Sequence, residues 1–182
     1  MIMTHTHIFQ ELSLYNKRKN MLSLIVAISE NNAIGKAGDL LCHLPNDLKH
    51  FKAVTTGATV VMGKKTFFSL PRRPLPNRRN IVLTRDIHFV HEQVEVAHSI
   101  DELLALTTAE ENVFIIGGGE VYQQFMPLVE RLYITHIHHR WEDADTFFPA
   151  IDPAIWQSVS EEHNNSDERH AYAYTFTTYE RK

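Results

Sequence analysis

Four short apolar runs, rich in β-branched residues, constrain the fold more than any other feature of the sequence. Runs of this length and composition are typical of strands that are buried on both faces of a parallel sheet. More polar segments with helical character separate them, so strands and helices are expected to alternate. The four runs are MLSLIVAIS at residues 21–29, ATVVMG at 58–63, RNIVLT at 79–84 and NVFII at 112–116.

Helix signals lie between these runs. One helix is expected to begin near Pro45 and Asn46, because Leu48, Phe51 and Val54 follow at three-residue spacing. The other helices are shorter, and a capping-box pair of Ser99 and Glu102 marks the start of one of them. These shorter helices are expected over residues 64–70, after the capping-box pair through Leu106, and over EVYQQFM at 120–126.

The last third of the chain alternates apolar and polar residues, which is typical of strands with little helix between them. The fold class expected is therefore α/β: a central, mostly parallel twisted sheet with helices on both faces and an antiparallel C-terminal edge. Residues 1–20 are expected to form an N-terminal extension, a flexible tail or a short docking helix, before one domain at 21–182. The alternating runs are RLYITHIH at 131–138, WQSVSEEH at 156–163 and AYAYTFTTYE at 171–180.

The net charge of −4 conceals a division along the chain. Residues 36–85 hold 10 basic and 2 acidic groups, whereas residues 86–182 hold 5 basic and 18 acidic groups. A basic segment is often only solvated surface, but it also suits a small ligand that carries several phosphates or carboxylates. The acidic remainder would repel a long polyanion, so nucleic acid is not an expected partner.

Compartment and membrane signals are few. Cys42 is the only cysteine of the sequence, so no internal disulfide can form, which agrees with a reducing compartment. The N-terminal residues lack the pattern of a secretory signal. No apolar run approaches the roughly 20 residues of a membrane-spanning helix. A cytoplasmic protein without a membrane partner is therefore expected.

Glycines, cations and threonines follow three of the predicted strands. The carboxyl ends of parallel strands meet at one sheet edge, where bare amides and cations bind phosphates. The glycine triplet could also serve only as a tight turn, since Tyr122 stands where the dinucleotide fingerprint requires its third glycine. Cations beside hydroxyls favour a 2′-phosphorylated dinucleotide. The three groups are Gly117, Gly118 and Gly119; Gly63, Lys64, Lys65 and Thr66; and Thr84 and Arg85.

Asp47 stands in the first turn of the helix that begins near Pro45, among the apolar residues Leu44, Leu48 and Phe51. Two interpretations remain open from the local sequence. The carboxylate could cap the helix. It could instead face a pocket, where desolvation would raise its pKa and its two oxygens could hold an N–C–N edge of a ligand.

The twelve histidines suggest further alternatives. Cys42 and His43 could form a nucleophile and base, although adjacent residues usually point apart. His163 and His170 flank an acidic loop and are expected at the surface. A metal site is conceivable on one strand and the loop after it, but a half-buried edge strand with solvated imidazoles explains the same pattern, and no metal is expected. The residues of that alternative are His136, His138, His139, Asp143 and Asp145.

Taken in chain order, these pieces resemble the dihydrofolate reductase family, from Met21 to about Arg181. Several independent motifs carry the resemblance in the order that the family has them. They are SLIVAIS, Ala33-Ile34-Gly35, Leu44-Pro45-Asn46-Asp47-Leu48 with Phe51-Lys52, VVMGKKT, Arg73-Pro74-Leu75-Pro76 with Arg78 and Asn80, IVLTR, FIIGGGEVYQQF, LYITHI, and Asp145-Thr146 with Phe148-Pro149.

The resemblance implies hydride transfer from NADPH to C6 of dihydrofolate, with a proton supplied to N5. By the same resemblance, Asp47 and Thr135 are the catalytic pair that holds the pterin's 2-amino and N3 edge. Phe51 is expected against the aminobenzoyl ring, and Arg78 on the glutamate α-carboxylate. The substrate-binding residues that it implies are Ile25, Val26, Leu48, Phe51, Lys52, Leu70, Arg78 and Ile116.

The family's cofactor site maps onto the glycine and cation groups and onto the residues around the nicotinamide. The loop from Ile34 to Leu41 resembles the mobile loop that closes over the nicotinamide. Thr84 and Arg85 are expected at the 2′-phosphate. The implied cofactor residues are Ala27, Ile34, Gly35, Gly63, Lys64, Lys65, Thr66, Leu83, Thr84, Arg85, Gly118, Gly119, Glu120, Val121 and Tyr122.

Cys42 departs from the familiar bacterial pattern, which carries a tryptophan there, and Leu41 stands where a proline is common. A small thiol leaves space beside the pterin, and a water in that space is expected to serve the proton supply. Two alternatives to a monomeric dihydrofolate reductase remain. One is the same-fold reductase of a pyrimidine intermediate in riboflavin synthesis, and the other is a non-catalytic protein that binds folate or NADPH.

Overall fold

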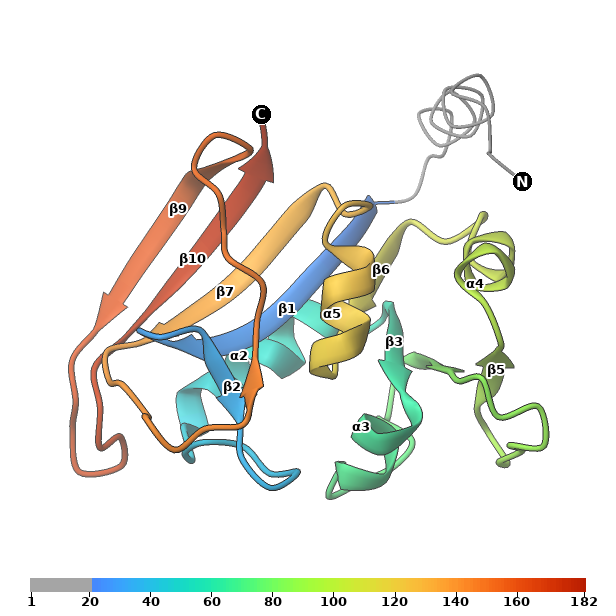
Figure 1. Ribbon diagram of the computed structural model, residues 1–182, viewed down its shortest axis with the longest axis horizontal. Helices are drawn as coiled ribbons and strands as arrows, with labels where there is room; N and C mark the ends of the chain where they lie inside the picture. Colours follow the sequence, from blue (N-terminus) through green and yellow to red (C-terminus); the bar gives the residue numbers. More distant parts are fainter. Residues whose placement is uncertain (1–20) are drawn as a thin grey trace.

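The computed structural model describes residues 21–182, so the predicted extension at residues 1–20 lies outside the described residues. Figure 1 shows a large twisted sheet with helices packed against it. Its strands are β1 (Met21–Ser29), β3 (Thr59–Gly63), β4 (Arg79–Leu83), β5 (Glu95–Ala97), β6 (Asn112–Ile115), β7 (Arg131–Ile137), β9 (Trp156–Asn164) and β10 (Tyr174–Arg181). A small second sheet pairs β2 (Ala33–Gly35) with β8 (Thr146–Phe147), and the helices are α2 (Pro45–Thr55), α3 (Lys64–Ser69), α4 (Ile100–Leu106) and α5 (Gly119–Phe125).

The strand order confirms the expected fold class. Among residues 21–182 the large sheet has the order β5-β4-β3-β6-β1-β7-β10-β9. All neighbours from β5 to β7 are parallel. Strand β10 runs antiparallel to both β7 and β9, so the two C-terminal strands form the antiparallel edge. The parallel part therefore gathers its carboxyl strand ends at one edge.

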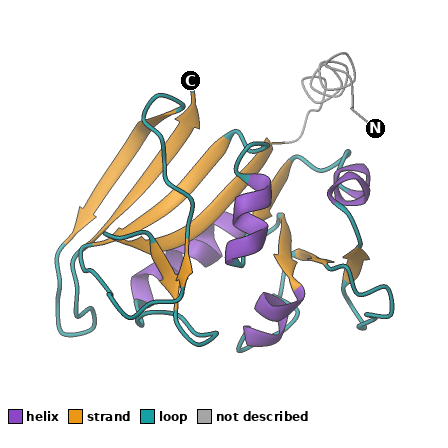
Figure 2. Ribbon diagram, viewed as in Figure 1, coloured by secondary structure: helices purple, strands orange, loops and turns teal. Residues whose placement is uncertain are grey.

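Helices cover both faces of the sheet, as predicted (Figure 2). Leu103 of α4 and Phe125 of α5 pack on one face, in the same cluster as Leu24 of β1. Phe67 of α3 packs on the other face with Ile25, the next residue of β1. Neighbouring residues of one strand are thus buried on opposite faces, which explains why β1 reads as a continuous apolar run.

Short elements were not predicted. Strands β2, β5 and β8 have two or three residues each, too few to establish a pattern. The capping-box prediction is half confirmed: Ser99 Oγ accepts from the backbone N–H of Glu102 at 3.1 Å. The Glu102 carboxylate instead accepts from the backbone N–H of His98. Within residues 21–182, no helix has the length and apolar character needed to cross a membrane.

Candidate active site

Asp47 and Thr135 meet at the carboxyl end of the sheet. Asp47 is in the first turn of α2, and Thr135 is a buried residue of β7 opposite Ala27 of β1. Thr135 Oγ1 donates to Asp47 Oδ1 at 2.5 Å. The helix has no side-chain cap, so the carboxylate is turned toward the sheet rather than used as a cap. Of the two interpretations of Asp47, the geometry favours the pocket.

Three effects act on the Asp47 carboxyl group. Burial raises its pKa above the ordinary value, and this effect exceeds the opposing ones. The hydrogen bond from Thr135 and the nearby His50 imidazole both lower the pKa, because each stabilises the charged form. His50 itself stacks on Phe176 with ring centroids 4.1 Å apart. The site therefore holds a carboxylate with an unusually high proton affinity beside aromatic walls.

Cys42 lies near this carboxyl group and is half-buried. Burial, and then the charge of Asp47, raises the pKa of the thiol to about 11. A thiol with that pKa stays protonated at neutral pH, so it lacks the thiolate that a nucleophile requires. The cysteine packs beside the buried side chains of Leu44, Ile137 and Tyr174. The alternative of Cys42 and His43 as a nucleophilic pair is not supported by this environment.

The predicted substrate residues divide into three groups. Ile25 and Ile116 are buried in the cluster under α2 and α3, and Phe51 and Leu70 pack against the same cluster. Val26 packs against the cluster on the opposite face of the sheet. Leu48, which is 48% exposed, and Lys52 are exposed residues of α2. The structure thus brings four of the predicted residues into one apolar cluster, which does not include the other three.

Arg78 lies at the edge of the same apolar group. Its guanidinium is 5.8 Å from the centre of the Phe51 ring. One nitrogen, Nη1, donates to Oγ1 of the buried Thr55 at 3.0 Å, and Nε donates to the Pro76 carbonyl at 2.9 Å. Partial burial lowers the pKa of Arg78. These contacts leave Nη2 available for an anionic group, and the sequence did not reveal the contact of Arg78 with Thr55.

The predicted phosphate-binding glycines approach one another closely. Gly63 N–H donates to the Gly117 carbonyl at 2.8 Å, which joins the ends of β3 and β6. A Cβ atom at Gly118 would lie 3.2 Å from Thr66 Oγ1, and one at Gly119 would lie 2.8 Å from Thr146. Only a residue without a side chain fits at Gly119. The backbone amides at the starts of α3 and α5 therefore lie along one bare edge.

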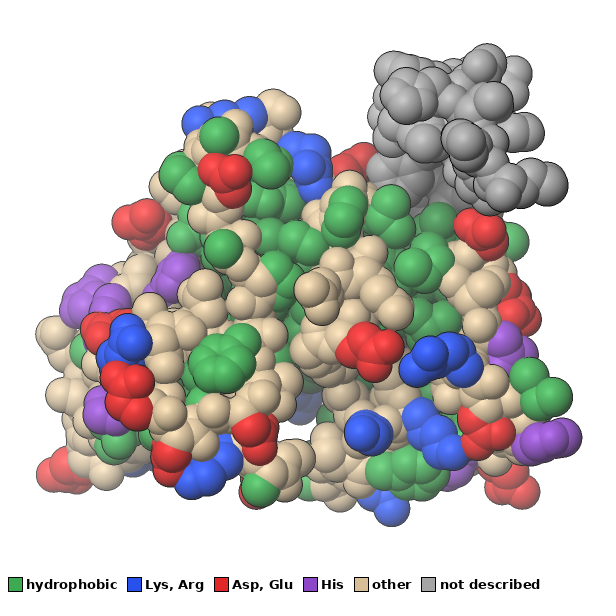
Figure 3. Space-filling view, viewed as in Figure 1, with side chains coloured by type: hydrophobic (Ala, Val, Ile, Leu, Met, Phe, Trp, Pro, Cys, Tyr) green, Lys and Arg blue, Asp and Glu red, His purple; other side chains and the backbone are tan. Residues whose placement is uncertain are grey.

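Cations surround this edge, and most have acidic neighbours. Lys64 Nζ forms an ion pair with Asp86 at 2.6 Å. Arg85 is 92% exposed and lies 3.7 Å from Glu120, and Lys65 is also exposed. Figure 3 shows Lys and Arg side chains gathered over α3 and the end of β4, beside a hollow in the surface. Part of the excess basic charge of residues 36–85 thus lies beside the starts of α3 and α5, which we call the glycine edge.

The remaining predicted cofactor residues come from several elements of the fold. Tyr122 is buried, and its hydroxyl donates to the Ile25 carbonyl at 2.8 Å. Ile34, Leu83 and Val121 pack in or against the cluster that contains Tyr122. Ala27 follows on β1 and packs against the same buried cluster as Cys42. Thr84, directly after β4, accepts the backbone N–H of Asp86 at 3.2 Å.

The loop after β2 is held by a second loop of the chain. Gly35 pairs with Thr146 of β8, and the backbone N–H of Ala37 donates to Asp145 Oδ2 at 2.7 Å. Lys36 and Asp143 form an exposed ion pair. The segment predicted to close over the nicotinamide is thus anchored by residues more than a hundred positions away. Asp143 and Asp145 were named from the sequence as conceivable metal ligands, and Asp145 also as part of a family motif, but the sequence did not reveal these contacts with the loop.

One expectation for the histidines is wrong. His136 Nε2 is 2.8 Å from the Tyr179 hydroxyl, and His138 Nε2 is 2.8 Å from Thr175 Oγ1. In the described part of the chain, no three His, Cys, Asp or Glu side chains are arranged to hold a metal ion. His163 is exposed, as expected, but the expectation for His170 is wrong because only 1% of it is exposed.

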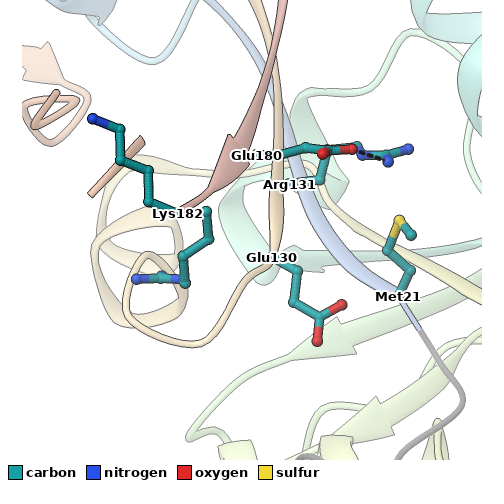
Figure 4. A pocket seen from close by; sticks show the side chains of 6 residues that line it. Met21, Glu130, Arg131, Glu180 and Lys182 are labelled. Atoms are coloured by element: carbon teal, nitrogen blue, oxygen red, sulfur yellow. Dashed lines mark hydrogen bonds and ion pairs between the residues drawn. The ribbon is translucent and has the colours of Figure 1, made fainter. Parts of the chain in front are cut away.

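A hollow at the opposite edge of the sheet offers no comparable chemistry (Figure 4). It lies where β1 and β7 begin and β10 ends, away from Asp47. Arg131 there pairs with Glu180, and Arg181 donates to the carbonyls of Val129 and Met126. Its charged groups are therefore largely engaged with the protein itself.

Comparisons with known proteins show which family the chain is similar to. The family model of dihydrofolate reductase matches residues 21–181. Dihydrofolate reductase of Bacillus subtilis (strain 168) is 43% identical over 162 residues, covering 89% of this chain and 95% of that protein. Dihydrofolate reductase type 3 of Salmonella typhimurium is 45% identical over 162 residues, covering 89% and 99%. The structure of dihydrofolate reductase from Enterococcus faecalis, complexed with NADP(H) and RAB-propyl, has a TM-score of 0.83 and 43% identity, covering 91% of this chain and 98% of that one. The chain belongs to the dihydrofolate reductase family.

Proposed function

We propose that this chain reduces 7,8-dihydrofolate to 5,6,7,8-tetrahydrofolate and thereby supplies one-carbon metabolism. NADPH supplies a hydride that is added to C6 of dihydrofolate, and the oxidised cofactor is NADP+. A proton from water is added to N5. The bond between Asp47 and Thr135 carries the proposal, because it places a carboxylate of raised proton affinity where a pterin edge can reach it.

Asp47 and Thr135 together orient the pterin ring. Thr135 fixes Oδ1, so the carboxylate plane is set and Oδ2 remains available to accept from a ligand N–H. Paired acceptors suit the 2-amino group and N3 of the pterin. A negative charge held in a partly desolvated site also stabilises positive charge that develops on the ring when N5 takes its proton.

The apolar residues near α2 provide the walls for the rest of the substrate. Ile25, Ile116, Phe51 and Leu70 share one cluster, which suits the pterin and aminobenzoyl rings. Arg78, held by Thr55, is the anchor for the glutamate α-carboxylate. Val26, Leu48 and Lys52 are assigned to the substrate by resemblance, and their places in the structure give the assignment no added support.

The glycine edge fits NADPH in shape and charge. Gly118 and Gly119 let the start of α5 pack closely against Thr66 and Thr146, and the backbone amides at this helix start suit a pyrophosphate. Lys64 and Arg85 are the cations for the 2′-phosphate region, and both have acidic neighbours that the phosphate would have to outcompete. Ile34 and Gly35 of β2 would cover the nicotinamide.

Oxidation of NADPH, followed by its absorbance with dihydrofolate as substrate, tests the proposal. Turnover with dihydrofolate is the expected result. A protein that binds NADPH but oxidises none with dihydrofolate would be the non-catalytic binder instead. Preference for the pyrimidine intermediate of riboflavin synthesis would indicate the same-fold alternative, which the set of Asp47, Phe51 and Arg78 argues against.

The proposal also covers the assembly, partners and location of the chain, and the part of it that carries the activity. The chain acts as a monomer, binds no nucleic acid or membrane, and works in the cytoplasm, in keeping with its single cysteine and its family. Residues 21–182 carry the activity, and residues 1–20 are dispensable for it. Equal kcat/KM for the full chain and for residues 21–182 would support this division, and loss of activity on truncation would contradict it.

A further inference from the structure

Helix α2, which carries Asp47, begins without a cap of its own. Its N-cap residue is Leu44, whose side chain offers no acceptor for a backbone N–H. Leu44 is only 4% exposed and packs with Ile137 and Tyr174 in the core. The next residue, Pro45, has no backbone N–H. The first N–H that needs an acceptor is therefore that of Asn46.

His170 provides that acceptor from a distant part of the chain. The backbone N–H of Asn46 donates to His170 Nε2 at 3.1 Å, across 124 positions of sequence. The Asn46 side chain also donates to the Tyr174 hydroxyl, at 2.8 Å. His170 lies in the connection between β9 and β10, and Tyr174 begins β10. The start of α2 is thus attached to the C-terminal part of the sheet by two hydrogen bonds.

The partners of the His170 ring determine its tautomer. Nδ1 lies 2.8 Å from Asp167 Oδ1, which also accepts the backbone N–H groups of Arg169 and His170. These hydrogen bonds lower the pKa of Asp167, and the one with the His170 ring has the largest effect. The carboxylate is therefore ionised at neutral pH and can only accept hydrogen bonds. Nδ1 must then carry the proton. Nε2 must be unprotonated, because the Asn46 N–H points at it.

We propose that Asp167 and His170 form a remote cap that fixes the first turn of α2 and thereby positions Asp47 for the pterin. Asp167 holds the ring in the tautomer that leaves Nε2 free, and Nε2 holds Asn46, the residue next to Asp47. Thr135 then meets a carboxylate whose backbone is already in place. The catalytic part of this inference rests on the proposed function, whereas the cap itself does not.

Two substitutions of His170 separate the cap from the contact with Asp167. In His170→Gln, the longer amide places its oxygen near the position of Nε2 and can still accept from Asn46. In His170→Asn, the shorter amide can still reach Asp167 but not Asn46. His163→Asn is the matched control, because His163 is an exposed histidine of the same region.

The His170→Asn variant should raise KM for dihydrofolate about fivefold, because one helix cap is lost. The Kd for NADPH should be unchanged. His170→Gln and His163→Asn are expected to stay within about twofold of the unsubstituted chain, since both retain the cap. Equal effects of Asn and Gln at position 170, or an equal loss of NADPH affinity, would overturn the positioning role.

Two measurements on the cap do not depend on activity. Nitrogen NMR of the unsubstituted chain should show His170 protonated on Nδ1 and unprotonated on Nε2, and a proton on Nε2 would overturn the proposal. Hydrogen exchange of the Asn46 amide should accelerate in His170→Asn but not in His170→Gln. If dihydrofolate is not reduced at all, these two results still decide whether the cap exists, so the two failures are distinguishable.

Discussion

Thr135 Oγ1 donates to Asp47 Oδ1 at 2.5 Å, which joins strand β7 to the first turn of α2 across 88 positions of sequence. This bond lowers the pKa of Asp47, whereas burial raises it more strongly. The two effects serve different needs, because burial strengthens electrostatic interactions with a ligand while the hydroxyl fixes the direction of the carboxylate.

Replacing Asp47 by Asn should reduce kcat/KM for dihydrofolate at neutral pH by about 10²- to 10⁴-fold, the range for losing a group that assists proton transfer. Asn keeps the size of the side chain and can still accept from Thr135, so the fold and the Kd for NADPH should be unchanged. Steady-state kinetics and NADPH titration make the comparison. Near-normal turnover by Asp47→Asn would contradict the role assigned to Asp47.

The same substitution should change stability in a pH-dependent way. Burial raises the pKa of Asp47 above its ordinary value of 3.8, so the folded state binds this proton more tightly than the unfolded chain does. The free energy of unfolding that Asp47 contributes therefore falls as pH rises from that value through the folded pKa. Asp47→Asn removes the charge and should raise the melting temperature at neutral pH.

Thermal unfolding of both proteins over a pH series checks this expectation. The advantage of Asp47→Asn should shrink as pH falls and disappear below pH 3.8, where the carboxyl group is protonated in both states. A melting temperature that is lower for Asp47→Asn at neutral pH would mean that the charged carboxylate stabilises the fold, against the direction inferred from its burial.

Thr55 is predicted to act on the substrate through Arg78. Its buried Oγ1 accepts from Arg78 Nη1 at 3.0 Å and donates to the Phe51 carbonyl at 2.8 Å. Thr55→Val keeps the shape but removes the acceptor, so KM for dihydrofolate should rise about tenfold, as for loss of a hydrogen bond to a charged group. Thr55→Ser retains the hydroxyl group, so its KM for dihydrofolate should stay near that of the unsubstituted chain.

A dihydropterin without the glutamate tail provides the control substrate, because Arg78 has no carboxylate to bind in it. Thr55→Val should leave its kinetics unchanged. Thr56→Val is the matched control variant, since the exposed Thr56 bonds only the Lys52 carbonyl at the end of α2. An equal rise of KM for both substrates would show that Thr55 acts on the whole site rather than on Arg78.

Asp86 is predicted to compete with the cofactor phosphate for Lys64. The carboxylate is 2.6 Å from Lys64 Nζ, in a pair that is about 40% exposed on both sides. Asp86→Asn frees the lysine and should tighten NADPH binding about two- to fivefold at low salt, in the range of a surface ion pair. The gain should be smaller in high salt and for NADH.

Replacing both Lys64 and Arg85 by Ala tests the same site in the opposite direction, because it removes the cations instead of freeing one. It should weaken NADPH binding much more than NADH binding, as measured by fluorescence titration of both nucleotides. Equal weakening of the two nucleotides would place the 2′-phosphate elsewhere, and the gain expected for Asp86→Asn would then lose its explanation.

The local sequence pattern was sufficient to predict the parallel strands of the large sheet but not the small sheet of β2 and β8. Strands β1, β3, β4 and β6 all begin and end within one residue of the predicted runs. Strands that are buried on both faces must be apolar throughout, so their sequences are easily recognised. Strands β2 and β8 have only three and two residues, and each pairs with the other. No local pattern announces such a pair.

The site shows the same division. The glycine edge was predictable because strand ends, glycines and cations follow one another in sequence. The burial of His170 was not, because its acidic neighbours suggest solvent while its partner Asn46 lies 124 positions away. Asp47 was ambiguous for a similar reason: Thr135 decides between cap and pocket, and only the fold or a family resemblance brings it near.

Cys42 offers the last prediction, since its thiol reports the charge of Asp47. Burial and then that charge raise the pKa of the thiol to about 11, so alkylation by iodoacetamide should be slow at neutral pH and should accelerate only in alkaline solution. Asp47→Asn removes one of the two causes and should shift the pH dependence of alkylation to lower pH. Superimposable profiles for the two proteins would mean that the Asp47 charge is not felt at Cys42. A shift confined to Asp47→Asn, and absent from a variant of the exposed Asp143, would place the thiol beside the carboxylate in solution.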